Sequence, residues 1–247
     1  DGLDEIIVPG FRNVNIYGKE NTVDEYQMIS SLDIAMRHEI ASTDEEASKY
    51  FISSVSFPCM EITDYNRDGR KDLIFIQDDH LKVYFQDENQ SYNNNNATEV
   101  KLNFEITKDY SFQMGNQNLV QRNRMKDKTG VRYLKDLNND GLLDLLVEKF
   151  SISDGTFNPK TQFHVYFARI DIKNEKIGGV FHNVPDHIII NKGFQVRSWI
   201  VDMNKDGKQD IVIPVIQISV LKFISMLFTG ELDVVLYVYL MNENDRY

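Results

Sequence analysis

The residues best placed to do chemistry in this chain are acidic side chains that recur in one pattern, Asp-x-Asn-x-Asp-Gly-x-x-Asp. The pattern occurs at Asp64–Asp72, Asp136–Asp144 and Asp202–Asp210, which are called loop 1, loop 2 and loop 3. A tightly curled segment aims alternate side chains at one point, and Ca²⁺ takes about six to eight oxygen ligands from such a segment. Three copies in one chain therefore predict three calcium sites.

Each loop offers side-chain oxygens at positions 1, 3, 5 and 9 and a backbone carbonyl at position 7. Glycine at position 6 stands where the chain must reverse, because glycine adopts a positive φ at little cost. The candidate ligands are Asp64, Asn66, Asp68, Arg70 and Asp72 in loop 1, Asp136, Asn138, Asp140, Leu142 and Asp144 in loop 2, and Asp202, Asn204, Asp206, Lys208 and Asp210 in loop 3. A truncated fourth copy opens the chain and adds Asp1, Leu3 and Glu5, with Glu5 at position 9.

Two other interpretations fit part of this pattern. A solvated turn rich in Asp, Asn and Gly needs no cation, but close carboxylates repel one another unless a cation lies between them. An EF-hand loop starts in the same way, ends with a bidentate Glu at position 12 and continues into a helix. Here position 12 is Phe75, Val147 or Ile213, inside apolar runs that are typical of buried strands. Each loop is therefore expected to lead into a β-sheet.

Further predicted strands recur around each loop. A strand with an aromatic residue follows at 14–17, 82–85, 164–167 and 237–240, and another strand precedes each full loop at 60–62, 131–134 and 198–201. The bend glycines lie 67, 72 and 66 residues apart, a pitch that suits a four-stranded propeller blade with loop insertions. We expect an all-β fold of antiparallel β-propeller blades, with repeats at approximately 1–53, 54–125, 126–192 and 193–247. A capped short helix is expected at 43–50.

The loops, each followed by an apolar strand, resemble the FG-GAP or VCBS repeats of integrin-α-type β-propellers. The resemblance covers nearly the whole chain, and it is closer to the bacterial VCBS variety because the Phe-Gly and Gly-Ala-Pro strings are absent. It implies one structural Ca²⁺ per repeat loop and a location outside the cell, at the cell surface or in the periplasm. The family includes adhesion proteins, lectins, carbohydrate-active enzymes and toxin scaffolds, so the resemblance implies a fold more than an activity.

The length of 247 residues accommodates about three and a half such repeats, whereas closed propellers have about four to eight blades. The chain starts inside a ligand loop and stops after an outer strand. We therefore expect a fragment of a longer polypeptide, with flanking sequence supplying the rest of the propeller.

The formal net charge is -11, with 38 acidic and 27 basic residues. This charge argues against a nucleic-acid partner or an anionic membrane surface, and calcium in the loops would cancel most of it. The apolar run 211–228 approaches the length that spans a bilayer, but Pro214, Gln217 and Lys222 interrupt it. We interpret the run as a buried strand followed by a short apolar helix or hairpin insertion, so no transmembrane segment is expected. The single cysteine, Cys59, is expected to be a small buried residue.

Catalytic patterns are absent from the sequence: there is no HExxH motif, Gly-x-Ser-x-Gly elbow or phosphate-binding glycine loop. The carboxylates that do form a pattern are already assigned to metal. The favoured hypothesis is a calcium-stabilised binding, adhesion or scaffolding module that meets a protein or glycan partner at a surface. The alternative is a propeller domain of a carbohydrate-active enzyme such as a polysaccharide lyase, with Tyr, His, Lys or Arg gathered around an acidic sugar.

Overall fold

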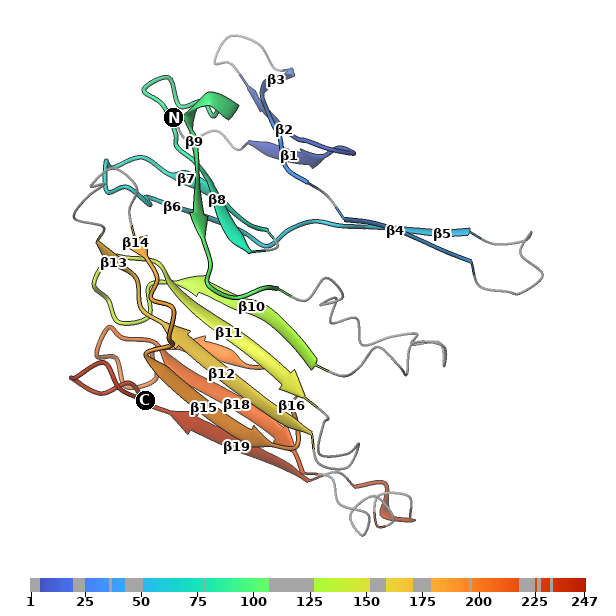
Figure 1. Ribbon diagram of the computed structural model, residues 1–247, viewed down its shortest axis with the longest axis vertical. Coiled ribbons are helices and arrows are strands. Elements are labelled where there is room, and N and C mark those ends of the chain that lie inside the picture. The colour runs from blue at the N-terminus through green and yellow to red at the C-terminus, as the bar shows by residue number, and fades with distance from the viewer. Residues whose placement is uncertain are drawn as a thin grey trace. The chain divides into compact units, whose positions relative to one another are not determined.

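The computed structural model divides the chain into two compact units, Asp1–Leu102 and Asn103–Tyr247 (Figure 1). The residues that it describes are 5–19, 25–35, 37–42, 51–77, 79–106, 127–151, 159–170, 179–195, 197–217, 225, 228–231 and 233–247. Antiparallel sheets make up both units, which confirms the predicted all-β fold class.

The first unit contains two sheets in which strands that neighbour in sequence pair with each other. One sheet has the order β1 (Ile6–Pro9), β2 (Val14–Lys19) and β3 (Tyr26–Leu32). The other has the order β6 (Met60–Thr63), β7 (Asp72–Gln77), β8 (His80–Tyr84) and β9 (Ala97–Lys101). A separate hairpin pairs β4 (Arg37–Ser42) with β5 (Phe51–Ser56), and a short 3₁₀ turn, η1 (Asn94–Asn96), precedes β9.

The second unit also contains two main sheets. The first has the order β10 (Asp127–Lys135), β11 (Asp144–Ser151), β12 (Lys160–Tyr166) and β15 (His187–Lys192), and a ribbon of β13 (Arg169–Ile170) and β14 (Gly179–Val180) lies between β12 and β15 in sequence. The second contains β16 (Phe194–Gln195), β17 (Trp199–Val201), β18 (Asp210–Ile216) and β19 (Val234–Tyr239). Because β19 pairs along one edge of β18, β16 and β17 share the opposite edge.

Each acidic loop connects the two strands of an antiparallel hairpin, as the apolar runs after the loops predict. Loop 1 joins β6 to β7, loop 2 joins β10 to β11, and loop 3 joins β17 to β18. In each hairpin the ninth-position aspartate is the first residue of the second strand. The next four residues of β7 and β11 are buried on both faces, which explains why these runs are continuously apolar rather than alternating, apart from Glu148.

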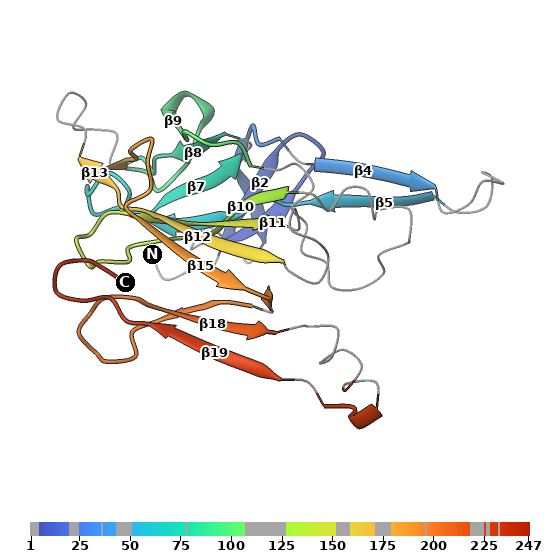
Figure 2. The ribbon, with the colours of Figure 1, turned by 60° about the horizontal axis from the view of Figure 1, so that its bottom comes forward.

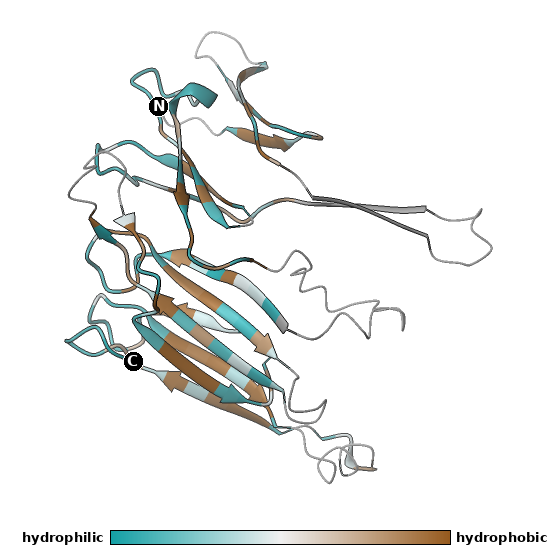
Figure 3. Ribbon diagram, in the orientation of Figure 1, coloured by the Kyte–Doolittle hydropathy of each residue, from teal (hydrophilic) through white to brown (hydrophobic). Residues whose placement is uncertain are grey.

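The core of each unit lies between its two sheets. In the first unit, Val14 and Ile16 of β2 pack against Leu73 and Phe75 of β7 and against Tyr84 of β8. In the second unit, Leu146, Phe163 and Val165 pack against Ile211, Ile213 and Val215. Figure 2 shows the β18–β19 layer stacked on the β12–β15 layer, and Figure 3 shows hydrophobic residues along these strands and hydrophilic residues in the connecting loops.

One sequence prediction is wrong, and two others fall wholly or largely outside the described residues. Cys59 is exposed, which contradicts its predicted burial. Its carbonyl accepts the Ile76 N–H of β7 at 2.9 Å, so it extends β6, which is an edge strand of its sheet. The strand predicted at the start of the run 211–228 is β18, but the insertion predicted after it falls largely on 218–224, outside the described residues. The helix predicted at 43–50 also lies outside them. Within the described part of the chain, no helix has the length and apolar character needed to span a bilayer.

Candidate metal sites

All three loops adopt the same conformation, built around the aspartate at position 1. In loop 1 the Asp64 carboxylate accepts the N–H of Asp68 (N···Oδ1 3.0 Å) and the N–H of Gly69 (N···Oδ2 2.8 Å). Asp136 and Asp202 accept the two equivalent N–H groups in loops 2 and 3, at 2.8 to 3.2 Å. The first aspartate therefore holds the bend in every copy.

The side chains at positions 3 and 5 turn toward the same stretch of backbone. Asn66 Oδ1 accepts the Asp68 N–H at 3.1 Å, so the oxygens of Asp64 and Asn66 lie within hydrogen-bond reach of one nitrogen atom. The Asp68 carboxylate in turn accepts the Arg70 N–H at 2.9 Å. Loops 2 and 3 repeat these contacts. Positions 1, 3 and 5 are therefore linked by hydrogen bonds within the loop, including one from the asparagine amide at position 3 to the carboxylate at position 5.

Two residues in each bend have a positive φ. The glycines at position 6 have φ values of 87°, 84° and 89°, as the sequence led us to expect. Position 4 also lies in the left-handed region, with φ near 63° at Arg67, Asn139 and Lys205, and this was not predicted. A residue with a Cβ in this region costs roughly 1 kcal/mol, which the side-chain to backbone bonds of the neighbouring positions offset.

The ninth-position aspartates have a second role that sequence reasoning missed. Asp72, Asp144 and Asp210 are completely buried. Each accepts one N–H from position 2 of its own loop, at 2.8 to 2.9 Å, and one from the residue beyond the next long strand, at 2.8 to 3.0 Å. The distant donors are Gln86, Ala168 and Met241. One carboxylate therefore joins the loop to the far end of the neighbouring strand.

Negative charge is concentrated in these loops and is compensated only in part: Arg70 forms an ion pair with Asp68, and hydrogen bonds lower the pKa of Asp68 and of Asp206. Burial raises the pKa of Asp144 to about 7, and the carboxylates of Asp140 and Asp136 add to the effect, against the opposing N–H groups of Ala168 and Leu137. Burial also raises the pKa of Asp72. A cation among these oxygens would favour the ionised forms of the two buried aspartates.

The raised pKa of Asp144 predicts a pH effect in the calcium-free protein. The folded state keeps the Asp144 proton up to about pH 7, whereas the unfolded state releases it near the ordinary value of 3.8. Between these values the unfolded state binds fewer protons, so this residue lowers the free energy of unfolding as pH rises, and its effect levels off above about pH 7.

Denaturant titrations with a chelator at several pH values would measure this effect against Asp144→Asn, which does not titrate. All other carboxylates titrate in both proteins, so the difference between the two profiles reports Asp144. We expect the parent protein to lose stability relative to the variant as pH rises. Parallel profiles would contradict the assignment.

The oxygens present fit a hard cation. At position 9, the two N–H bonds use two of about four acceptor positions of the carboxylate, so acceptor capacity remains. In the described part of the chain, acidic, Cys and His side chains alone form no complete metal site, so calcium there also needs the asparagine oxygens, backbone carbonyls and water that it normally accepts. Of the fourth copy, Asp1 and Leu3 lie outside the described residues and Glu5 is exposed.

A second repeated turn, also missed in the sequence, follows the aromatic strand in two repeats. In Asp87–Ser91 and Asn242–Arg246 the first residue donates its N–H to the carbonyl of the fifth, and its side chain accepts the N–H groups of the third and fifth. Both turns carry Glu-Asn at their second and third positions, which is the signal that could have revealed them. Arg70 donates to the Gln86 carbonyl just before the first turn, and Lys208 contacts Asn242, Glu243 and Asp245 in the second.

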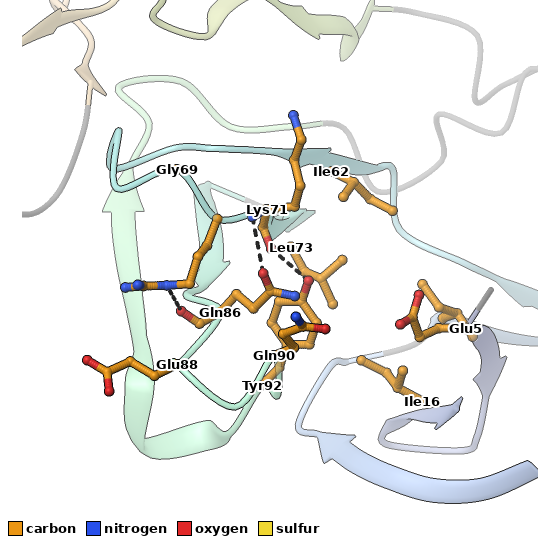
Figure 4. A pocket seen from close by; sticks show the side chains of 12 residues that line it. Glu5, Ile16, Ile62, Gly69, Lys71, Leu73, Gln86, Glu88, Gln90 and Tyr92 are labelled. Carbon is orange, nitrogen blue, oxygen red and sulfur yellow. Dashed lines mark hydrogen bonds between the residues drawn. The ribbon is translucent and has the colours of Figure 1, made fainter. Parts of the chain in front are cut away.

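A cavity of about 830 Å³ lies beside loop 1 in the first unit. Figure 4 shows Gln86, Gln90 and Tyr92 on one side of it and Glu5 and Ile16 on the other. The Tyr92 hydroxyl donates to the Lys71 carbonyl at 2.7 Å, and burial raises the pKa of Tyr92 to about 12. Isoleucine and leucine side chains also line the cavity, and apolar walls with a few polar groups are suited to binding a small ligand.

No protein-family model matches this chain, and no curated protein sequence matches it. The candidate metal sites therefore rest on the geometry of the loops, in which the same hydrogen bonds recur three times.

Proposed function

We propose that this chain is part of a calcium-stabilised β-propeller that serves as a binding or scaffolding module at the cell surface, outside the cell or in the periplasm. The observation that carries the proposal is the threefold recurrence of one loop conformation, in which the same hydrogen bonds hold the side chains of positions 1, 3 and 5 at the end of a hairpin. Similar local sequences explain similar turns, and a cation would supply the countercharge that several acidic side chains in one short loop favour.

The arrangement of the sheets supports the propeller part of the proposal. Each main sheet has strands that pair mostly in sequence order, and in both units one sheet packs face to face on the next. A propeller is built from successive antiparallel sheets of about four strands, so this arrangement supports the proposal.

Calcium would stabilise the fold by screening the carboxylates and by giving them a shared partner in addition to the N–H donors of the loop. The loop residues hold the bend, and the ninth-position aspartate bonds the end of the neighbouring strand, so a rigid loop would also fix the position of that strand. Loops of this kind in extracellular modules bind calcium at roughly 0.1 to 1 mM, which supports a location where calcium is abundant.

Thermal unfolding with calcium and with a chelator tests the proposal. At ten times the dissociation constant each site adds about 1.4 kcal/mol, so three sites should raise the Tm by roughly 10 °C. The triple variant Asp68→Asn, Asp140→Asn and Asp206→Asn should lose most of this shift. The matched control is Glu99→Gln, Glu105→Gln and Glu231→Gln, which removes the same charge from exposed positions outside the loops.

Isothermal titration calorimetry gives an independent measure, and about three sites are expected in the control protein. Equal Tm values with and without calcium, together with no heat of binding, would refute the metal assignment. An equal calcium shift in both triple variants would place the ion elsewhere.

The carbohydrate-active enzyme alternative has one supporting observation, the cavity beside loop 1, whose lining mixes polar and apolar side chains. A lyase needs a base that ionises near the working pH, and the raised pKa of Tyr92 does not suit that role. Incubation with a panel of uronate polysaccharides separates the two hypotheses: turnover would favour the enzyme, and binding without turnover would favour the module.

A further inference from the structure

Loops 2 and 3 belong to the same unit and are joined by hydrogen bonds. The backbone carbonyl of Leu137, at position 2 of loop 2, accepts the N–H of Gln209, at position 8 of loop 3, at 2.7 Å. Lys135, the residue before loop 2, donates from its ammonium group to Gln209 Oε1 at 2.9 Å. Two hydrogen bonds therefore connect the end of one hairpin to the acidic loop of the next.

The bends of the two loops also lie against each other. A Cβ added to Gly207, at the bend of loop 3, would lie 3.0 Å from Asn139 Nδ2 of loop 2. Asn139 is the position 4 residue of its loop, where the backbone has a φ of 63°. The conformation of the loop 2 bend therefore decides where this amide lies against loop 3.

Leu137 links these contacts to the ninth-position aspartates. It donates its N–H to the carboxylate of Asp144 in loop 2 at 2.8 Å, and its carbonyl accepts the N–H of the residue just before Asp210. Its side chain is completely buried in the core cluster that also contains Ile211, the residue just after Asp210. Leu137 is therefore held by loop 2 and adjoins the ninth position of loop 3.

We propose that loops 2 and 3 bind calcium cooperatively, so that an ion in one loop raises the affinity of the other. The inference rests on the proposed calcium binding and adds a regulation of those sites. An ion held by the oxygens of loop 2 fixes the bend, and with it the Leu137 carbonyl and the Asn139 amide. Loop 3 then loses less conformational freedom when it binds its own ion, and by linkage the effect is reciprocal.

The charges of the two loops act in the opposite direction. An ion in loop 2 cancels negative charge near loop 3 and so weakens the attraction of loop 3 for a second ion. Positions 4, 5 and 6 of both loops are exposed, so water and salt screen this effect. The contacts through Leu137 and Asn139 are not weakened in this way. We therefore expect positive cooperativity at physiological salt concentration.

Isothermal titration with calcium tests the proposal in a protein whose loop 1 is disabled by Asp68→Asn. This two-loop protein should bind calcium with a Hill coefficient above unity. Proteins with one loop left carry Asp140→Asn or Asp206→Asn in addition, and all three changes are at exposed positions. The midpoint calcium concentration of the two-loop protein should be about fivefold lower than that of either single-loop protein.

A change at the contact between the bends separates cooperativity from binding itself. Asn139→Gly removes the amide that lies against Gly207 and suits a positive φ, so it should lower the Hill coefficient of the two-loop protein without abolishing binding. The matched control is Lys205→Gly, the same change at position 4 of loop 3, where the side chain is exposed. This control should leave the Hill coefficient unchanged.

Hydrogen exchange gives a readout at the connection between the loops. In a protein where only loop 2 can bind, calcium should slow the exchange of the Gln209 N–H severalfold, although Gln209 belongs to loop 3. In a protein where only loop 1 can bind, calcium should leave this exchange unchanged. Circular dichroism of each variant checks that it folds.

The outcomes distinguish failure of the cooperativity from failure of the calcium sites. Binding with a Hill coefficient of unity or less would overturn the cooperativity and leave the calcium sites in place. An unchanged exchange rate of the Gln209 N–H when loop 2 fills would also overturn it. A two-loop protein that binds no calcium would refute the metal assignment itself, and the cooperativity with it.

Discussion

Replacing Asp210 with alanine is expected to lower the free energy of unfolding by about 2 to 4 kcal/mol, even after calcium has been removed. The side chain is completely buried and accepts the N–H groups of Met203 and Met241, both at 2.9 Å. Met241 is itself buried, so its N–H would lose its partner without gaining water. The destabilisation therefore comes from unpaired backbone groups in addition to any loss of metal.

The control for this experiment lies four residues earlier. Asp206 is exposed, and its carboxylate accepts only local N–H groups of loop 3. Asp206→Ala should change the calcium-free stability by less than about 1 kcal/mol, since exposed sites have small effects, and should reduce only the stabilisation that calcium provides. Urea denaturation with a chelator measures both variants. Equal losses in the two would show that the ninth position acts only as a ligand.

The second large effect is expected from the core of the second unit. Phe163→Ala should cost about 3 to 5 kcal/mol, because truncating a buried aromatic side chain removes apolar contacts and leaves a cavity. Phe163 is completely buried and packs between the β12–β15 layer and β18. Loss of this contact should loosen the packing between the two sheets.

A neighbouring strand provides the matched control. Ile190 of β15 is 57% exposed, and Ile190→Ala should change stability by about 0.5 kcal/mol or less. Equilibrium unfolding followed by near-ultraviolet circular dichroism measures both variants. If Phe163→Ala were as mild as the control, the two sheets would not depend on this core for their packing.

Local interactions explain why so much of each loop could be predicted. The contacts among positions 1, 3, 5, 6 and 7 join residues two to five apart, so the residue types and their spacing are enough to predict the turn. The strand after each loop was equally accessible, since a continuous apolar run at this position has few alternatives. Position 4 was missed because Arg67 and Lys205 have no local signal for a positive φ.

Contacts across variable distances could not be predicted in the same way. The ninth-position aspartates bond donors that lie 14, 24 and 31 residues later, because the hairpin after each loop differs in length. No fixed spacing marks Gln86, Ala168 and Met241, and their N–H groups carry no side-chain signature. Pairing of the strands is what brings these groups to the aspartate.

The sequence by itself determined the all-β class, the three acidic turns and the strands that flank them, because each depends on neighbouring residues and on side-chain alternation. Only the tertiary structure decided which apolar faces are covered. Val165 and Val238 occupy the same place in their repeats, yet the first is buried and the second is 42% exposed. Burial of a strand face depends on whether another sheet lies against it, and that is a property of the assembled fold rather than of the strand.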